Sequence, residues 1–302
     1  MSANANGETK HPAKFSRPIM HTMQQYLTRL AASQPDKKHW YVLDPMGGVG
    51  GVFDLHAIEN DFPDPRVLHI MCVEIESEWA DVAEAHPRLS REDRVVCADF
   101  FTWCDRYLGS FDLIAVSPTY GNRMADHHDA KEDSVRNTYK HKLGRYLSDG
   151  SSAGMQWGDE YRRFHRKLWE EAWDLLEDGG FLLLNVKDHI RQGVKQPVSA
   201  WHRATMTSVG FKLIDVTDVA VSGNRQGENG NARVDHEQVY LFQKPWGKAM
   251  GNNNVAVDYA NMSLFKGGAG VRKGDEKGVR KGVRKGVRKG VRKGDEKGDG
   301  DE

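Results

Sequence analysis

Long apolar runs and cysteines are both scarce in this chain of 302 residues. No run of eighteen or more apolar residues occurs, which argues against a membrane-spanning helix, and the polar start "MSANANGETKHPAKF" lacks the hydrophobic region of a secretory signal. The cysteines Cys72, Cys97 and Cys104 have no C-x-x-C spacing, which argues against a disulfide framework or a zinc site. We therefore expect a cytoplasmic protein with reduced, mostly buried thiols.

The formal net charge is zero, but the charges are unevenly distributed along the chain. Residues 271–302 carry twelve Lys or Arg and seven Asp or Glu, a net charge of +5, which leaves −5 for the remainder. This region contains the tetrapeptide VRKG five times. A four-residue period with glycine in each unit fits neither an amphipathic helix nor a solenoid, so we expect 246–302 to be a disordered tail. Such a tail is either a loose phosphate-binding arm for nucleic acid or a solvated repeat expansion.

Short apolar runs alternate with helical patterns over residues 11–245, after a flexible N-terminus at 1–10. This alternation predicts an α/β domain with a doubly wound, seven-stranded and mostly parallel sheet. No helical pattern joins the last two strands, which favours an antiparallel strand at the sheet edge. The expected strands are 40–45, 67–74, 94–98, 111–117, 180–187, 211–216 and 237–243. The expected helices are 18–32, 50–59, 77–85, 100–107, 158–177 and 197–208.

The expected helix at 158–177 has a strongly apolar face and a Gly-Gly end. The spacing of its large apolar residues indicates packing against the core, not a cofactor-binding motif. These residues are Tyr161, Phe164, Leu168, Trp169, Trp173 and Leu176.

A glycine-rich loop, "DPMGGVGG", follows the first expected strand. It places Gly47, Gly48 and Gly50 between Asp44 and an expected helix. Glycines permit positive φ and let a ligand approach the backbone closely, while a helix start offers free amide groups. The dinucleotide fingerprint G-x-G-x-x-G is not met, because its last position falls on Phe53. The pattern therefore disfavours a nicotinamide cofactor, and a simple tight turn is the alternative.

Acidic residues also follow the next two expected strands. Glu74 and Ile75 end the second strand, where a carboxylate can accept hydrogen bonds from both hydroxyls of a ribose. Asp99 and Phe100 follow the third strand. Taken singly, these residues are equally explained as helix caps, solvated acids or core. Because parallel strands end at one edge of a sheet, together with the glycine loop they indicate a cofactor that contains a nucleoside.

The stretch "VSPTYGN" closes the fourth expected strand with Ser117, Pro118 and Tyr120. The exocyclic amine of a base is conjugated with its ring, and it becomes nucleophilic when its hydrogens are held by well-placed acceptors. A hydroxyl, a backbone carbonyl fixed by proline and a stacking ring supply this chemistry, whereas the alternative is a β-turn. No cysteine stands beside this proline, which argues against the covalent mechanism of 5-methylcytosine formation.

These motifs resemble those of S-adenosylmethionine-dependent DNA amino-methyltransferases. The glycine loop is similar to their D-P-x-x-G-x-G sequence, "SPTY" to their S/N/D-P-P-Y/F motif, and "HPAKF" at 11–15 to a segment that precedes the loop. The resemblance covers residues 11–120 by motif and extends by strand pattern to about residue 244. It implies the Rossmann-like class I methyltransferase fold and a base flipped out of double-stranded DNA.

The same resemblance implies the roles of individual residues. S-adenosyl-L-methionine would be bound by Phe15, Asp44, Gly47, Gly48, Gly50, Glu74, Ile75, Asp99 and Phe100. Ser117, Pro118 and Tyr120 would be catalytic. An insertion at 121–157 would face the substrate, and Thr119, Asn122, Arg123 and Lys187 would bind it.

One position departs from the family motif, because Thr119 stands where its second proline is expected. Threonine frees φ, so we expect the backbone of this corner to be less fixed than in the family. Serine at the first position is most similar to the N4-cytosine enzymes, which favours cytosine N4 over adenine N6. An RNA N2-guanine methyltransferase and a catalytically silent nucleic-acid-binding protein of the same fold are the alternatives.

We expect a nucleoid-associated protein of bacterial or phage origin, for which restriction–modification, phage protection and regulation are the alternative settings. We expect no metal, since the adjacent residues His127 and His128 cannot easily face one ion. No obligate protein partner is indicated either.

Overall fold

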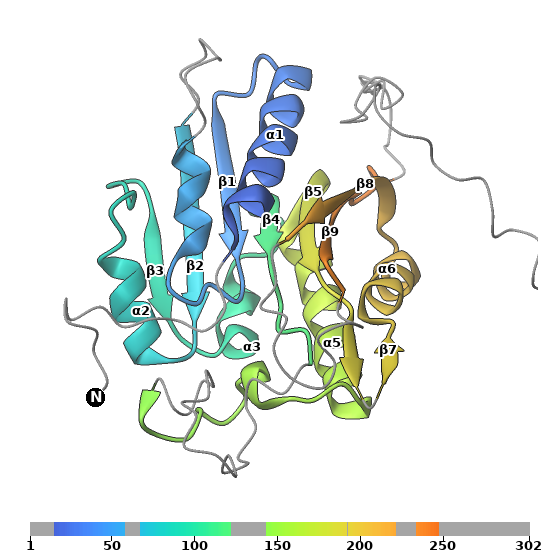
Figure 1. Cartoon of the computed structure of the whole chain (residues 1–302). Coiled ribbons are helices and arrows are strands. Elements are labelled where there is room, and N and C mark those ends of the chain that lie inside the picture. The colour runs from blue at the N-terminus through green and yellow to red at the C-terminus, as the bar shows by residue number, and fades with distance from the viewer. Residues whose placement is uncertain (1–14, 58–66, 122–142, 192, 222–233, 248–302) are drawn as a thin grey trace, which may run out of the picture. The chain divides into compact units, whose positions relative to one another are not determined.

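The computed structural model describes residues 15–57, 67–121, 143–191, 193–221 and 234–247 (Figure 1). All of them belong to one of the two compact units of the chain, Met1–Leu264. The expected flexible N-terminus, nearly all of the expected tail and most of the expected 121–157 insertion lie outside the described residues. Within the described part of the chain, no helix combines the length and apolar character needed to cross a membrane.

A seven-stranded sheet forms the centre of the fold, in the order β3-β2-β1-β4-β5-β9-β8. Its strands are β1 (His39–Asp44), β2 (Val67–Glu74), β3 (Arg94–Cys97), β4 (Phe111–Val116), β5 (Leu176–Val186), β8 (Lys212–Ala220) and β9 (His236–Gln243). The strands from β3 to β5 pair in parallel, and β9 pairs antiparallel with both β5 and the edge strand β8. The predicted doubly wound, mostly parallel sheet with antiparallel pairing at its edge is confirmed.

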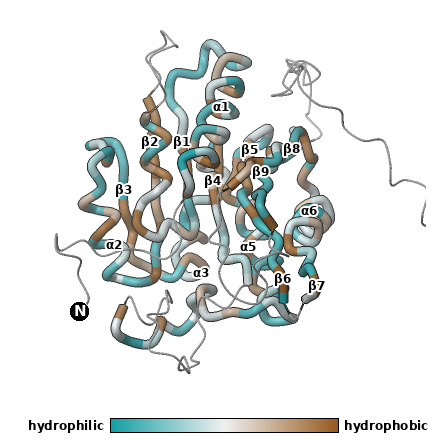
Figure 2. The backbone as a smooth tube through the Cα atoms, viewed as in Figure 1, coloured by the Kyte–Doolittle hydropathy of each residue, from teal (hydrophilic) through white to brown (hydrophobic). Residues whose placement is uncertain are grey.

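Two layers of helices cover the sheet. Side chains of each central strand alternate between the two faces, and each face packs against helices. Leu113 of β4 packs with α1 (Arg17–Ser33) and the 3₁₀ helix η1 (Gly51–Ala57) on one face. Its neighbour Ile114 packs with α5 (Asp159–Leu175) on the other face. Figure 2 shows hydrophobic residues recurring along the strands between these layers. The remaining helices with a described position are α2 (Ser77–Glu84), α3 (Phe100–Trp103), η2 (Cys104–Arg106), η4 (Ser152–Gly154) and α6 (Val198–Val209).

Several details differ from the sequence predictions. The expected helix at 100–107 is divided into α3 and η2, and the strands β5 and β8 are longer than expected. The expected helix at 50–59 is the 3₁₀ helix η1, which follows Gly50 in the left-handed conformation (φ 76°). The expected helix at 158–177 ends at Leu175, because Leu176 is extended and pairs with Phe111 of β4. Placing Leu176 on the helical face was therefore wrong. A short hairpin of β6 (His189–Arg191) and β7 (Val194–Gln196) was not predicted.

Candidate functional site

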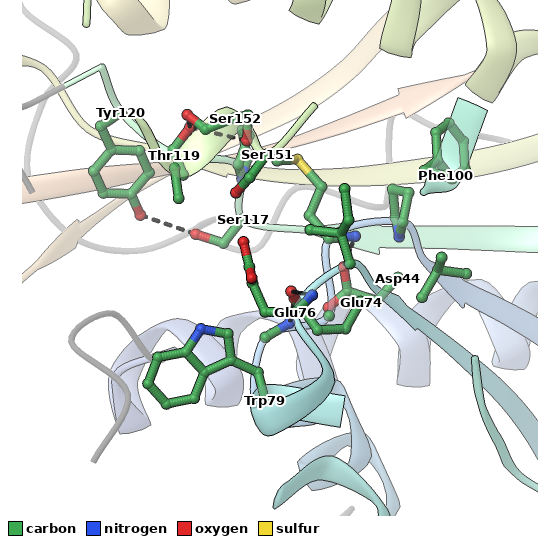
Figure 3. Close-up of a pocket in the computed structure, with 18 of the residues that line it drawn as sticks. Asp44, Glu74, Glu76, Trp79, Phe100, Ser117, Thr119, Tyr120, Ser151 and Ser152 are labelled. Atoms are coloured by element: carbon green, nitrogen blue, oxygen red, sulfur yellow. Dashed lines mark hydrogen bonds between the residues drawn. The ribbon is translucent and has the colours of Figure 1, made fainter. Parts of the chain in front are cut away.

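A cavity of about 750 Å³ lies where the carboxyl ends of the parallel strands meet. Loops that follow β1, β2, β3, β4 and β5 all contribute to its wall, and Figure 3 shows the labelled residues around it. Phe15, Asp44, Gly47, Gly48, Glu74, Ile75, Asp99, Phe100, Ser117, Pro118, Thr119, Tyr120 and Lys187 line it. The glycine loop and the Ser117–Tyr120 corner thus open onto the same cavity. Gly50 is not part of its wall, and Asn122 and Arg123 lie outside the described residues.

Gly47 and Gly50 require glycine for different structural reasons. The backbone of Gly47 lies so close to β2 that an added Cβ would be 2.0 Å from Cys72 Sγ, and its amide donates to the Val73 carbonyl at 2.9 Å. Gly50, at φ 76°, faces Phe53, whose ring would be 2.8 Å from an added Cβ. Gly47 therefore lets the loop approach the strand that carries Glu74, whereas Gly50 serves the turn behind the cavity.

Two buried carboxyl groups, those of Asp44 and Glu74, line the cavity and accept hydrogen bonds from backbone amides. Glu74 accepts hydrogen bonds from the amides of Gly48 and Glu76, each at 2.8 Å, and Asp44 accepts one from Met46 at 3.0 Å. Burial raises the pKa of Asp44 to about 7, with a further rise from the charge of Glu74. Burial likewise raises the pKa of Glu74 to about 7, although its backbone hydrogen bonds act in the opposite direction. Both groups therefore change protonation near neutral pH.

Asp99 caps α3 and also faces the cavity. Its Oδ1 accepts a hydrogen bond from the Phe101 amide at 2.8 Å, so the helix-cap interpretation of this residue holds. An added Cβ at Gly150 would lie 3.3 Å from the other carboxylate oxygen, Oδ2. Among the described residues Oδ2 has no hydrogen-bond partner in the structure, so it is available to a ligand. Phe100 is both a core residue and part of the cavity wall.

The segment from Arg145 to Ala153 belongs to the expected substrate-facing insertion at 121–157, and it contributes Leu147 and residues 150–153 to the cavity wall. Buried Glu76 anchors this segment by accepting hydrogen bonds from the Ser148 amide at 2.9 Å and hydroxyl at 3.0 Å. Arg145 adds an ion pair with Glu76 at 2.7 Å. In sequence, Glu76 is only one more acid in "VEIESE", without a signal that distinguishes it from a surface residue.

The Ser117–Tyr120 corner contains a polar cluster that sequence reasoning found only in part. Tyr120 donates its hydroxyl hydrogen to Glu237 at 3.0 Å, so Ser117, also 3.0 Å from the Tyr120 oxygen, is the donor in that pair. The amide nitrogen of buried Asn185 lies 2.8 to 3.2 Å from an oxygen of each of these three residues. Lys187 faces the second oxygen of Glu237 at 3.7 Å. Asn185 is the last residue but one of β5 and Glu237 is the second residue of β9, and both were missed because no motif surrounds them.

Thr119 is held on two sides. Its hydroxyl donates to the Ser152 carbonyl at 3.2 Å, and its own carbonyl accepts a hydrogen bond from the Tyr161 hydroxyl at 2.6 Å. The expectation of a less fixed backbone at this position, drawn from the missing proline alone, overlooked these contacts. Tyr161 was interpreted only as a core residue of the helix, and its ring is indeed fully buried.

The described wall of the cavity is strongly acidic. It contains one lysine, Lys187, against six carboxyl groups: Asp44, Glu74, Glu76, Asp99, Asp188 and Glu237. Burial, followed by the nearby charge of Arg191, lowers the pKa of His189, which favours its neutral form. Such a wall suits a ligand with hydroxyl, amino or cationic groups better than one with phosphates.

No family model matches the chain, and no curated protein matches it. Solved structures of related fold share little sequence with it. The [4+2]-cyclase SpnF has 13% identity over 74% of this chain and 82% of its own, with a TM-score of 0.43. A Galdieria sulphuraria protein assigned as a sarcosine dimethylglycine methyltransferase has 14% identity over 80% and 95%, with a TM-score of 0.46. A Listeria monocytogenes protein assigned to the class I S-adenosylmethionine-dependent methyltransferases has 10% identity over 83% and 67%, with a TM-score of 0.46.

These likenesses are too distant to transfer an activity. The fold class follows from the sheet itself, whose order and single reversed strand β9 define a Rossmann-like fold of the class I methyltransferase type. Function depends on the site and not on the fold.

Proposed function

We propose that this chain transfers a methyl group from S-adenosyl-L-methionine to the exocyclic amino group of a base in double-stranded DNA. The observation that carries the proposal is the shared cavity, which joins the glycine loop and acidic strand ends to the Ser117–Tyr120 corner. A cofactor pocket without this corner, or the corner without the pocket, would support only binding.

The cofactor half of the cavity fits the chemistry of S-adenosyl-L-methionine. Its volume of about 750 Å³ lies within the usual range of small-molecule sites. Glu74 would accept hydrogen bonds from ribose hydroxyls, and the available Oδ2 of Asp99 would accept one from the adenine amine. The carboxyl groups of the wall favour the positive charges of the ligand, and no lysine or arginine of the described wall lies beside the glycine loop to hold a phosphate. When bound, the cofactor supplies an electrophilic methyl group on a positively charged sulfur.

The corner would prepare the target amine. Ser117 directs its hydroxyl hydrogen to Tyr120, which leaves its oxygen with a lone pair that can accept a hydrogen from the amine. The carbonyl of Pro118 would be a second acceptor, and the ring of Tyr120 would stack on an extruded base. Acceptors on both amino hydrogens draw the nitrogen lone pair out of conjugation with the ring.

The line from Ser117 through Tyr120 ends on the carboxylate of Glu237. This order lets Glu237 stabilise positive charge that develops on the amine and receive its proton through the two hydroxyls. The similarity of "SPTY" to the N4-cytosine enzymes makes cytosine N4 the preferred target in this proposal, ahead of adenine N6.

The test is incubation of the full chain with radiolabelled S-adenosyl-L-methionine and separate pools of duplex DNA, RNA and protein. We expect label in DNA, on N4-methylcytosine after enzymatic digestion and chromatography. Ser117→Ala should reduce the label strongly, whereas Ser110→Ala, an exposed serine outside the cavity wall, should not. Label in RNA alone would replace the DNA proposal with the RNA alternative. Binding of DNA without label in any pool would favour a silent binding protein.

A further inference from the structure

Three buried side chains form a line of hydrogen bonds that ends on the carbonyl of Thr119. Trp169 Nε1 donates to His202 Nδ1 at 3.1 Å, His202 Nε2 lies 2.8 Å from the Tyr161 hydroxyl, and that hydroxyl donates to the Thr119 carbonyl at 2.6 Å. The residues come from α5 and α6 and are fully buried. The line therefore connects the packed interior between two helices to the backbone of the catalytic corner.

The direction of every hydrogen bond in this line follows from its chemistry. An indole nitrogen only donates, so Nδ1 of His202 is the acceptor. The pKa of His202 lies well below its usual value, because the ring is buried, with a smaller effect from nearby His165. The neutral ring then carries its hydrogen on Nε2 and donates to Tyr161, which leaves the single hydrogen of Tyr161 for the Thr119 carbonyl. Each group has one defined role, and none has to change protonation.

The endpoint of the line is the position where the family motif has its second proline. A proline limits the backbone through its ring, which threonine lacks. Here the carbonyl of Thr119 is held by Tyr161 and its hydroxyl by Ser152, so the residue is fixed from both sides. The first contact restrains the peptide plane between Thr119 and Tyr120, and the second restrains the Thr119 side chain, so both flanks of this residue are fixed directly after the Pro118 carbonyl, one of the proposed acceptors.

We infer that Tyr161, oriented by His202 and Trp169, is a positioning residue that replaces the restraint of the missing proline and holds the Ser117–Tyr120 corner in its reactive geometry. This inference rests on the proposed function for its effect on methyl transfer. Its structural part, the fixing of the corner by the Tyr161 hydroxyl, is independent of any substrate.

Tyr161→Phe tests the role, because it removes one oxygen and retains the ring. The matched control is Tyr26→Phe, since Tyr26 is also a fully buried helical tyrosine, and its hydroxyl pairs with Thr217 at 2.9 Å in another part of the core. Hydrogen–deuterium exchange of the peptide that contains residues 117–121 is compared in both variants, together with kcat and KM for methyl transfer. We expect faster exchange of this peptide only in Tyr161→Phe. We also expect a fall in kcat of about 10- to 100-fold, with KM for the cofactor changed less than about twofold.

Thr119→Pro provides the rescue. If the line substitutes for a proline, Tyr161→Phe should lower kcat much less in the Thr119→Pro background than in the wild type. Equal exchange of the 117–121 peptide in Tyr161→Phe and Tyr26→Phe would overturn the inference, as would equal falls in kcat in these two variants. A wild-type chain that transfers no methyl group would refute the proposed function, and the exchange experiment would still decide whether Tyr161 fixes the corner.

Discussion

The carboxyl group of Glu74 accepts a hydrogen bond from the backbone amide of Gly48 at 2.8 Å, which ties the end of β2 to the loop after β1. The second oxygen accepts from the Glu76 amide at 2.8 Å. One side chain therefore shapes the glycine loop and also presents a carboxylate to the cavity. The lone pairs left on its oxygens remain for a ligand, since each carboxylate oxygen can accept more than one hydrogen bond.

Glu74→Gln should weaken binding of S-adenosyl-L-methionine by about tenfold or more, because an amide has one acceptor oxygen where the carboxylate has two and carries no charge. Isothermal titration calorimetry with the cofactor alone measures this effect. Glu84→Gln, on the exposed end of α2, is the control and should bind like the wild type. Equal affinities of both variants and the wild type would contradict the assignment of Glu74 to the cofactor.

The contribution of Asp44 and Glu74 to the stability of the ligand-free chain should fall as the pH rises from 5 to about 7. Burial raises the folded-state pKa of Asp44 and Glu74 to about 7 from the ordinary values of 3.8 and 4.5. The folded chain thus binds these protons more tightly than the unfolded chain, so their stabilisation is complete below about pH 4 and is lost as the pH rises through about 7. Each carboxyl contributes at most about 1.4 kcal/mol per pH unit.

Thermal melts across this pH range check the prediction. The stability of Asp44→Asn relative to the wild type should rise as the pH increases from 5 to about 7, whereas that of Asp36→Asn, at an exposed position, should stay constant. Cofactor binding should show the opposite trend and tighten as the pH rises through about 7, because the carboxylate is the form that accepts ribose hydrogen bonds. The same pH dependence of stability in Asp44→Asn and in the wild type would be inconsistent with a raised pKa of Asp44.

The sequence predicted those parts of the site that follow directly after strands. Asp44, Glu74, Asp99 and Ser117 each stand at or just after the end of an apolar run, and the alternation of strands and helices brings such positions to one edge of a parallel sheet. Local patterns were sufficient here because the position of each residue depends on the end of its own strand.

Contacts between distant parts of the chain were not predictable in the same way. Tyr120 and Glu237 are 117 positions apart, and Thr119 and Tyr161 are 42 apart, so no local pattern connects them. Tyr161 also satisfied the helical period perfectly, which concealed the polar role of its hydroxyl. The wrong prediction for Leu176 has the same cause. The helical spacing of apolar residues continues through Leu176, but its pairing with the distant residue Phe111 makes it part of a strand.

Tyr120→Ala should remove most methyl transfer and change cofactor affinity by less than about twofold, because the ring contributes stacking on a base of about 1–3 kcal/mol. Tyr120→Phe should retain the stacking but lose the hydrogen bonds to Ser117 and Glu237. Its kcat is therefore expected between those of the wild type and Tyr120→Ala. Tyr41→Ala, which removes a half-exposed tyrosine on β1 outside the cavity wall, is the control for general destabilisation. Parallel loss of cofactor binding and transfer in Tyr120→Ala would mean that the residue is structural.

Removal of the tail after Gly247 should lower affinity for duplex DNA at low salt and leave kcat at saturating DNA unchanged. The cut retains Gly247, whose amide donates to Asp178 at 3.2 Å. It removes the twelve Lys or Arg of residues 271–302. For each DNA phosphate that these side chains no longer neutralise, the slope of log K against log salt should become shallower by about 0.9. Fluorescence anisotropy from low to physiological salt measures this slope.

A chain of full length with these twelve residues changed to glutamine separates the charge of the tail from its length. It should behave like the truncated chain, because the proposed arm acts through its positive charges. A slope equal to that of the wild type in both variants would show that the tail neutralises no phosphates and would leave the solvated repeat as its description.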